Sequence, residues 1–293
     1  MDATQEFHNL DITALTRQRL ETLRRTRLNG SGETTADPAY KCPKCRDTGW
    51  EEVKGENDYT FMRECSCGLL QRQKMDRKLK FAAIPKEFQN QTVESFMTDC
   101  YSTPQNRELA QMAKIIAKRY VEQFEEIQET GKGLYFYSSV KGSGKTRLAV
   151  SIANDLIRQK MISAKFATTL QILDQIKATW GEIKKAGQED GGSEQQLIND
   201  IISVPVLVID DIGAENVKDW VNERFYNILN GRMIEKRITI FTSNCRIEDL
   251  KLDERIVNRI IKMALPIEFP AESIRVSLAR KENSDLLDRL LGK

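Results

Sequence analysis

The sequence predicts an α/β fold in which a parallel sheet is flanked by helices. From residue 133 onward, apolar runs of strand length alternate with longer stretches whose apolar residues recur at helical spacing. One run, VPVLVIDDIG (204–213), is almost wholly apolar until it reaches two acids, as in a strand buried on both faces, and RITIFTSN (237–244) predicts another buried strand. This alternation favours parallel strands joined by helical crossovers.

The first third of the chain follows a different pattern. Residues 9–28 place leucines and an isoleucine among arginines and predict a basic helix, which Gly, Pro and small polar residues interrupt over 29–40. A segment with four cysteines (41–68) and a basic connector (71–88) come next. Residues 103–131 then predict one long amphipathic helix that stops at Gly131.

The remaining elements are expected in regular order. They are a strand at 133–139, a helix at 145–160, a strand running into a helix at 164–180, a strand at 204–212, a helix at 221–236 and a strand at 237–243. We therefore expect three parts: an N-terminal, cysteine-bearing helical module (1–80), a linker (81–103) and an α/β domain (104–293).

Composition limits the possible classes of function. The 293 residues carry 45 Lys and Arg against 43 Asp and Glu, so the formal charge of +2 does not indicate a nucleic-acid binder, and any such role needs a local basic face. No apolar leader or membrane span is evident, which predicts a cytoplasmic protein. In that reducing compartment, six cysteines favour free thiols or metal ligands over disulfides.

A phosphate-binding loop is predicted between the strand at 133–139 and the helix at 145–160. YSSVKGSGKTRLA matches G-x-x-x-x-G-K-[ST] except that Ser139 replaces the first glycine. The expected phosphate contacts come from Ser139, Gly142, Ser143, Gly144, Lys145 and Thr146. Lys145 would reach the β- and γ-phosphates of ATP, and the Thr146 hydroxyl would bind Mg²⁺. The competing interpretation is a Gly/Ser turn with a chance lysine.

Two adjacent acids end the strand at 204–212. Asp210 is expected to hold Mg²⁺ together with Thr146, and Asp211 to position or deprotonate the attacking water. Asn244 ends the next strand, where its amide could orient that water or the γ-phosphate. Alternatively, the acids only end a strand in solvent and the asparagine is a turn residue.

The four cysteines predict a structural zinc site. Cys42 and Cys45 form C-x-x-C, and Cys65 and Cys67 form C-x-C after 19 intervening residues. Two close thiolate pairs suit tetrahedral zinc with no open position for catalysis. A redox C-x-x-C and an iron–sulfur cluster are the rival interpretations.

Basic side chains further along suggest contacts with other molecules. Arg255 and Arg259 lie four apart on one helical face, where either could be an arginine finger for a neighbouring subunit's γ-phosphate or simply a solvated charge. Arg275 could close over the nucleotide within the same chain. Lys177 and Trp180 could meet single-stranded DNA, although a tryptophan on an amphipathic helix more often belongs to the core.

The order of these motifs resembles that of AAA+ ATPases, and more narrowly the DnaC/DnaI family of replicative helicase loaders and their phage-encoded relatives. The resemblance rests on KCPKCRDTGW, GSGKTRLAVSIAND, VLVIDDIGAE, ITIFTSN and ERIVNRI. It implies that Asn244 is the sensor-1 residue, Arg275 the sensor-2 arginine, and Arg259, with Arg255 as the other candidate, the arginine finger. Asp211 stands where a glutamate is commoner in AAA+ proteins, which suggests slow, switch-like hydrolysis.

The resemblance also implies a function. The N-terminal module would dock on a hexameric replicative helicase, the ATPase domain would self-associate through AAA+ interfaces, and ATP would control loading of the helicase onto single-stranded DNA. Alternatives are a transposition ATPase similar to the IstB group, a nucleotide-dependent adaptor that does not hydrolyse ATP, and a zinc nucleic-acid-binding protein with an incidental phosphate loop.

Overall fold

The computed structural model describes residues 40–55, 59–186, 192–213 and 219–291, and a few side chains within these ranges, Trp180 among them, are not described. Contacts divide the chain into two units, Met1–Cys67 and Gly68–Lys293, each of which is considered by itself. The basic helix expected over 9–28 lies outside the described residues.

The described part of the first unit is a β-hairpin. Strands β1 (Trp50–Lys54) and β2 (Thr60–Glu64) pair antiparallel, with Trp50 opposite Glu64 and Val53 opposite Phe61. The backbone amide of Gly55 donates to the carbonyl of Tyr59 (2.8 Å) and closes the hairpin. The sequence suggested a helical module, because the two short strands are too polar to show an alternating pattern.

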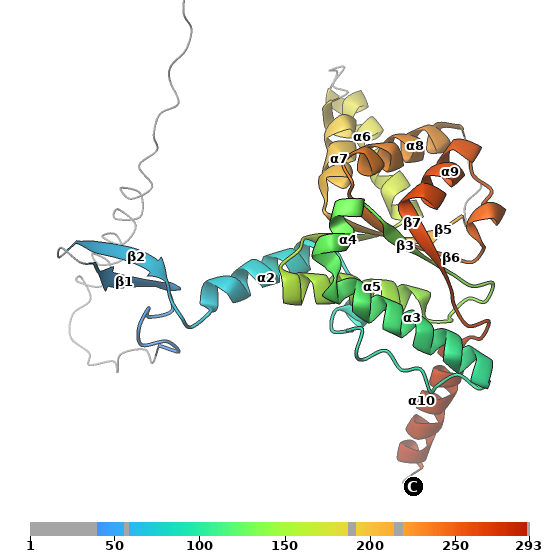
Figure 1. Cartoon of the computed structure of the whole chain (residues 1–293), viewed down its shortest axis with the longest axis horizontal. Coiled ribbons are helices and arrows are strands. Elements are labelled where there is room, and N and C mark those ends of the chain that lie inside the picture. Colours follow the sequence, from blue (N-terminus) through green and yellow to red (C-terminus); the bar gives the residue numbers. More distant parts are fainter. Residues whose placement is uncertain (1–39, 56–58, 187–191, 214–218, 292–293) are drawn as a thin grey trace, which may run out of the picture. The chain divides into compact units, whose positions relative to one another are not determined.

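The second unit is built on a five-stranded parallel sheet of order β4-β5-β6-β3-β7 (Figure 1). Its strands are β3 (Gly133–Tyr137), β4 (Ala164–Thr168), β5 (Val206–Ile212), β6 (Ile238–Ser243) and β7 (Ala264–Glu268). Its helices are α2 (Leu69–Phe81), α3 (Pro104–Glu122), α4 (Phe124–Thr130), α5 (Lys145–Lys160), α6 (Thr169–Ala186), α7 (Gly192–Ser203), α8 (Asp219–Ile234), α9 (Glu254–Met263) and α10 (Ile274–Leu290), with short 3₁₀ turns at Lys86–Phe88 and Ile247–Asp249.

Helices cover both faces of this sheet, as the alternation of patterns predicts. Side chains of α3, α4 and α5 form one apolar core against the sheet, and side chains of α6, α7, α8 and α9 form the other. The two layers are visible on opposite sides of the strands in Figure 1. Neighbouring residues of one strand alternate between these cores, so that Tyr135 packs in one and Leu134 and Phe136 in the other.

The long helix expected over 103–131 is two helices. Thr103 caps α3 by accepting from the backbone amide of Asn106, and Pro104 occupies its first turn. Gln123, with φ −100° and ψ 22°, leaves helical geometry and separates α3 from α4. Gly131 ends α4 in the left-handed conformation (φ 69°), as the sequence indicates.

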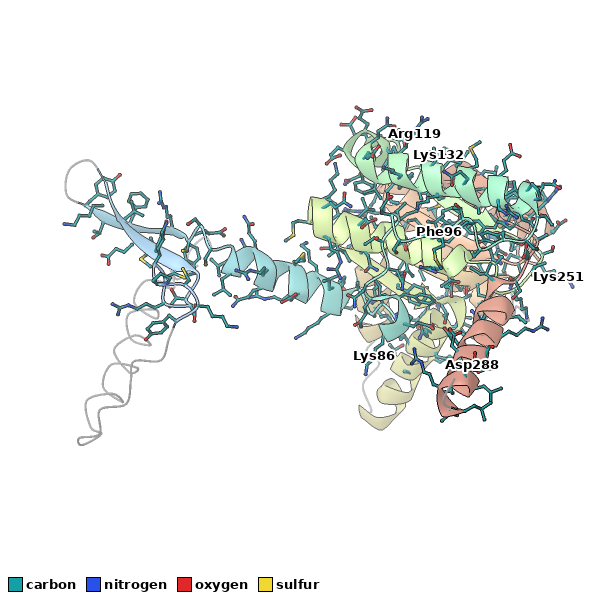
Figure 2. All side chains as sticks on the ribbon, turned by 90° about the horizontal axis from the view of Figure 1, so that it is seen from below. Lys86, Phe96, Arg119, Lys132, Lys251 and Asp288 are labelled. Atoms are coloured by element: carbon teal, nitrogen blue, oxygen red, sulfur yellow. The ribbon has the colours of Figure 1, made fainter. Side chains whose placement is uncertain are left out.

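The stretch 81–103, expected to be a linker, is packed into the core of the second unit. Ala82, Phe96 and Tyr101 are at most 1% exposed, and Phe96 lies in the interior of the unit (Figure 2). Side chains of α5 hold its irregular backbone: the Asn154 amide donates to the carbonyls of Phe88 and Gln91, both at 2.8 Å. The segment therefore belongs structurally to the sheet domain.

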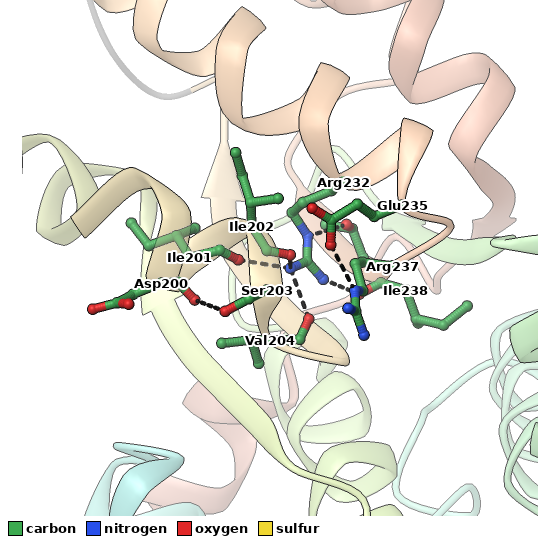
Figure 3. A network of polar contacts seen from close by, with 10 residues as sticks. Asp200, Ile201, Ile202, Ser203, Val204, Arg232, Glu235, Arg237 and Ile238 are labelled. Carbon is green, nitrogen blue, oxygen red and sulfur yellow. Dashed lines mark hydrogen bonds and ion pairs between the residues drawn. The ribbon is translucent and has the colours of Figure 1, made fainter. Parts of the chain in front are cut away.

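A fully buried arginine, Arg232, joins α7 to β6 (Figure 3). Its guanidinium donates to the carbonyls of Ile201 (2.7 Å), Ile202 (3.1 Å), Val204 (2.9 Å) and Ile238 (2.5 Å) and to the Thr239 hydroxyl (2.9 Å). Burial lowers the pKa of Arg232 to about 9, which still leaves it charged at neutral pH. It thereby satisfies carbonyl groups that the end of α7 leaves without helical partners.

Candidate functional site

The predicted phosphate-binding loop lies between the end of β3 at Tyr137 and the start of α5 at Lys145. Gly142 and Gly144 have φ of 78° and 100°, a region that glycine adopts without strain. A Cβ on Gly144 would lie 3.1 Å from the Tyr101 hydroxyl, which donates to the carbonyl of Ser143 at 2.7 Å. Tyr101, from the stretch 81–103, therefore packs against the loop at Ser143 and Gly144.

Lys145 is 6% exposed and its ammonium is held inside the loop. Nζ donates to the carbonyl of Val140 (3.1 Å) and to Asn244 Oδ1 (3.2 Å). Burial lowers the pKa of Lys145, and the nearby Asp211 carboxylate partly opposes this shift. The acceptors that the ammonium contacts directly are neutral, so a bound phosphate would give it a direct ionic partner.

Asp210 is the buried acid at the end of β5. The hydroxyls of Thr146 (2.8 Å) and Thr242 (2.6 Å) both donate to its Oδ1. Burial raises the pKa of Asp210, while these two hydrogen bonds oppose the shift. A carboxylate and a hydroxyl oxygen this close together fit Mg²⁺, which takes one or two carboxylates and completes its shell with water and phosphate oxygens.

Asp211 and Asn244 meet beside this pair. Asn244 Nδ2 donates to Asp211 Oδ1 at 2.6 Å, while Asn244 Oδ1 accepts from Lys145. One asparagine thus links the cation of the loop to the second acid. Asp211 adopts φ 58°, which is uncommon for a non-glycine residue, and its backbone amide donates to the Thr242 hydroxyl (2.9 Å).

These residues line one cleft of about 470 Å³, within the range of small-molecule sites. Among the predicted site residues it brings together Gly142, Ser143, Gly144, Lys145, Thr146, Asp210, Asp211, Asn244 and Arg275. Arg275 comes from α10, whose first amide, that of Ile274, donates to the carbonyl of Gly142 (3.0 Å). Ser139, in contrast, is exposed and does not line the cleft.

The two arginines of α9 do not line the cleft of their own chain. The Arg259 guanidinium stacks 4.0 Å from the centre of the Tyr226 ring and donates to the Tyr226 hydroxyl (2.6 Å) and to Asn230 Oδ1 (3.1 Å). Arg255 pairs with Asp253 (3.0 Å) and lies 5.1 Å from the same ring. Both arginines of α9 therefore contact Tyr226 of α8.

The residues considered for DNA are placed only in part. Lys177 lies on α6, with Nζ 5.5 Å from the centre of the Trp220 ring and 3.5 Å from Asp174 Oδ1. The side chain of Trp180 lies outside the described side chains.

Sequence reasoning missed several side chains of the cleft. Thr242 contacts both acids, and Glu87, Phe88, Gln91, Ile274 and Glu282 line the walls. Thr242 carried one signal, because it lies near the end of a predicted buried strand, two residues before Asn244. Phe88 and Gln91 carried none, because Phe88 ends a short 3₁₀ turn, Gln91 follows it in irregular backbone, and neither belongs to a periodic pattern.

The four cysteines of the first unit form a metal-type cluster. The Sγ atoms of Cys42, Cys45, Cys65 and Cys67 lie within 4.8 Å of one another, and the contacts Cys42–Cys65 and Cys45–Cys67 are both 3.7 Å. Zn–S bonds of about 2.3 Å imply a tetrahedral edge of about 3.8 Å, so the donor set fits zinc. Asp47 Oδ1 accepts from the Cys42 amide (2.9 Å) and fixes the turn.

A family model described as IstB-like ATP binding protein matches residues 65–282. The chain belongs to this IstB-like family. The replicative helicase loader DnaC of Escherichia coli (strain K12) is 27% identical over 249 residues, 84% of this chain and 91% of DnaC. The replicative helicase loader DnaI of Bacillus subtilis (strain 168) is 29% identical over 160 residues, 50% of this chain and 48% of DnaI.

A crystal structure of the DnaC helicase loader has a TM-score of 0.52 and 25% identity, over 63% of this chain and 99% of that chain. The second unit therefore has the DnaC type of AAA+ fold. An ATP-binding IstB-like family agrees with a cleft that combines a glycine-bearing loop, a buried lysine and two acids. The family match begins at residue 65, so it includes Cys65 and Cys67 and excludes Cys42 and Cys45. Within the described residues, no helix is both long and apolar enough to span a membrane.

Proposed function

We propose that this chain is an ATP-dependent loader that places a replicative DNA helicase on single-stranded DNA. The observation that carries the proposal is the similarity to DnaC over 84% of this chain and 91% of that loader. The cleft supports it, because its side chains are those that ATP binding and hydrolysis require.

Lys145 would bind the β- and γ-phosphates, and the backbone amides of Gly142, Ser143 and Gly144 would surround them at the start of α5. Thr146 and Asp210 are the residues that would hold Mg²⁺, which neutralises charge on the phosphates when bound. Lys145 now contacts Asn244, and bound phosphates would compete with that amide for the ammonium. Nucleotide binding would thereby change the environment of Asn244.

Hydrolysis would fall to Asp211 and Asn244. The Asp211 carboxylate would orient or deprotonate the attacking water, and the Asn244 amide would hold that carboxylate in place through the 2.6 Å hydrogen bond. Arg275 would meet the nucleotide from α10. An aspartate side chain is shorter than that of a glutamate and would position the attacking water less closely. This suits slow ATP hydrolysis that switches the protein between two states.

The remaining contacts would be made with other chains. Arg259 or Arg255 would serve as the arginine finger of a neighbouring copy, and the cysteine module of the first unit, with zinc bound, would dock on the helicase. Lys177 is a candidate contact for single-stranded DNA. ATP state would then bias the assembly between holding the helicase and releasing it, as a shift between two populations.

The test is light scattering with size-exclusion on zinc-loaded protein mixed with the replicative helicase of the same host, with and without ATP. A copy lacking residues 1–67 is the comparison, because the second unit begins at Gly68. We expect a complex with the full chain that the truncated chain does not form. If the full chain forms no complex in any nucleotide state, the loader function is wrong. An undiminished complex in the absence of ATP turnover would instead indicate a non-hydrolysing adaptor.

A further inference from the structure

Two adjacent acids on one strand, Asp210 and Asp211, both line the same cleft. Successive side chains of a regular strand point to opposite faces, so an undistorted β5 would send only one of them there. The pairing of β5 with β6 explains the difference. Ile209 pairs with Phe241 and Ile212 with Ser243, so that two residues of β5 face one residue of β6.

Thr242 is the single residue of β6 opposite this bulge. It is 1% exposed, and its hydroxyl makes one hydrogen bond to each bulge residue. It accepts from the Asp211 backbone amide at 2.9 Å and donates to Asp210 Oδ1 at 2.6 Å. The amide displaced from the regular ladder by the bulge therefore has a partner, and the left-handed backbone of Asp211 (φ 58°) is fixed.

The same contact orients the Asp210 carboxylate. Thr146 and Thr242 both donate to Oδ1, and among the hydrogen bonds of the described residues none is made by Oδ2. Two hydroxyls on one oxygen set the rotation of the carboxylate and leave the other oxygen available to a ligand.

We propose that Thr242 is the positioning residue of this site. Its hydroxyl holds the β5 bulge, so that the Asp210 carboxylate is set for the metal of the nucleotide and the Asp211 carboxylate is set for the water. The inference rests on the proposed ATPase function for its consequences, but the geometry that it asserts for Asp211 holds in the nucleotide-free protein. Thr242 touches neither nucleotide nor water in this scheme and acts through the two acids.

Two substitutions of Thr242 distinguish the effect of its hydroxyl from the effect of its side-chain shape. Thr242→Val keeps the branched side chain and removes the hydroxyl, whereas Thr242→Ser keeps the hydroxyl. Ser243→Ala is the matched control: Ser243 is equally buried on the same strand, but its hydroxyl donates to the carbonyl of Ile212, accepts from the Cys245 amide and, among the hydrogen bonds of the described residues, makes none to either acid. A merely structural role predicts similar effects for loss of either hydroxyl.

The first measurement is amide hydrogen exchange in nucleotide-free protein. We expect exchange at Asp211 to be faster by about tenfold in Thr242→Val than in the unaltered chain, as for the loss of one net hydrogen bond. It should be near the unaltered rate in Thr242→Ser and Ser243→Ala. Equal protection of the Asp211 amide in Thr242→Val would overturn the inference whatever the protein's function.

The second measurement is binding of a fluorescent ATP analogue with and without Mg²⁺. Thr242→Val should bind the metal-free nucleotide within about twofold of the unaltered chain and should lose about 10–100-fold of the gain that Mg²⁺ gives, with serine restoring it. A Mg²⁺ response that survives in Thr242→Val overturns the positioning role. If the unaltered chain itself shows no nucleotide binding, the proposed function fails, and the exchange measurement still decides the role of Thr242.

Discussion

Replacing Arg232 by methionine should lower the free energy of unfolding of the second unit by about 3–5 kcal/mol. Five buried acceptors lose their donor at a cost of about 1–3 kcal/mol each, and removal of a desolvated charge offsets part of that cost. The five acceptors are four carbonyls and the Thr239 hydroxyl, all close to the buried guanidinium. Methionine fills much of the same space but donates no hydrogen bond, so in the folded variant these buried acceptors have neither water nor a protein donor as a partner.

The magnitude should be visible in a thermal melt. In a unit of this size each 1 kcal/mol moves Tm by about 2–4 °C, so Arg232→Met should lower Tm by about 6–20 °C. Scanning calorimetry, supported by urea unfolding, measures this for the truncated chain and for the full chain.

Arg237→Met is the control, because Arg237 is partly exposed and pairs with Glu235 at 3.1 Å on the surface. A surface pair of this kind contributes about 0–1 kcal/mol, so the control should melt close to the unaltered protein. If Arg232→Met also melted within about 1 kcal/mol of the unaltered protein, the hydrogen bonds in Figure 3 would not be what holds α7 to β6.

Three further outcomes are expected. Lys145→Ala should weaken ATP binding by at least about 100-fold in a fluorescence titration while leaving the melting temperature within a few degrees, because it removes the buried cation of the loop. Asp210→Asn should stabilise the metal-free protein at pH 7. Burial raises the folded pKa of Asp210, so the stability that its protonated form contributes is present at acid pH and is lost as pH rises through that pKa. Thermal melts at acid pH should therefore show no advantage of the asparagine. Removing metal with a chelator, or Cys45→Ser, should unfold the hairpin of the first unit, since zinc supplies about 10–16 kcal/mol in such modules, while circular dichroism shows the second unit still folded.

The motifs of the candidate site were predictable because each depends on residues that are close together in the sequence. Three motifs are of this kind: the loop between β3 and α5, the buried strand before Asp210 and the cysteine pairs. In each, the residue types and their spacing are specific to one kind of site. The structure brings the loop, the acids, Asn244 and Arg275 together because parallel strands end at one edge of the sheet.

Other features depend on partners distant in sequence. The β5 bulge exists because Thr242 of β6 supplies hydrogen bonds to Asp210 and Asp211, and no pattern within β5 announces it. The stretch 81–103 shows no helical or strand periodicity, so its sequence predicted a linker. Side chains of α5, Asn154 among them, form the hydrogen bonds that hold this irregular backbone in the core. The break between α3 and α4 at Gln123 likewise lacks a Gly or Pro to mark it.

The central claim is that ATP state in this chain controls delivery of a helicase to single-stranded DNA. The most direct measurement counts helicase hexamers retained on a circular single-stranded DNA, with the unaltered chain, with Lys145→Ala, and without either. We expect retention to rise with the unaltered chain and ATP, and to stay near the helicase-alone level with Lys145→Ala. Equal retention in all three reactions would contradict the account.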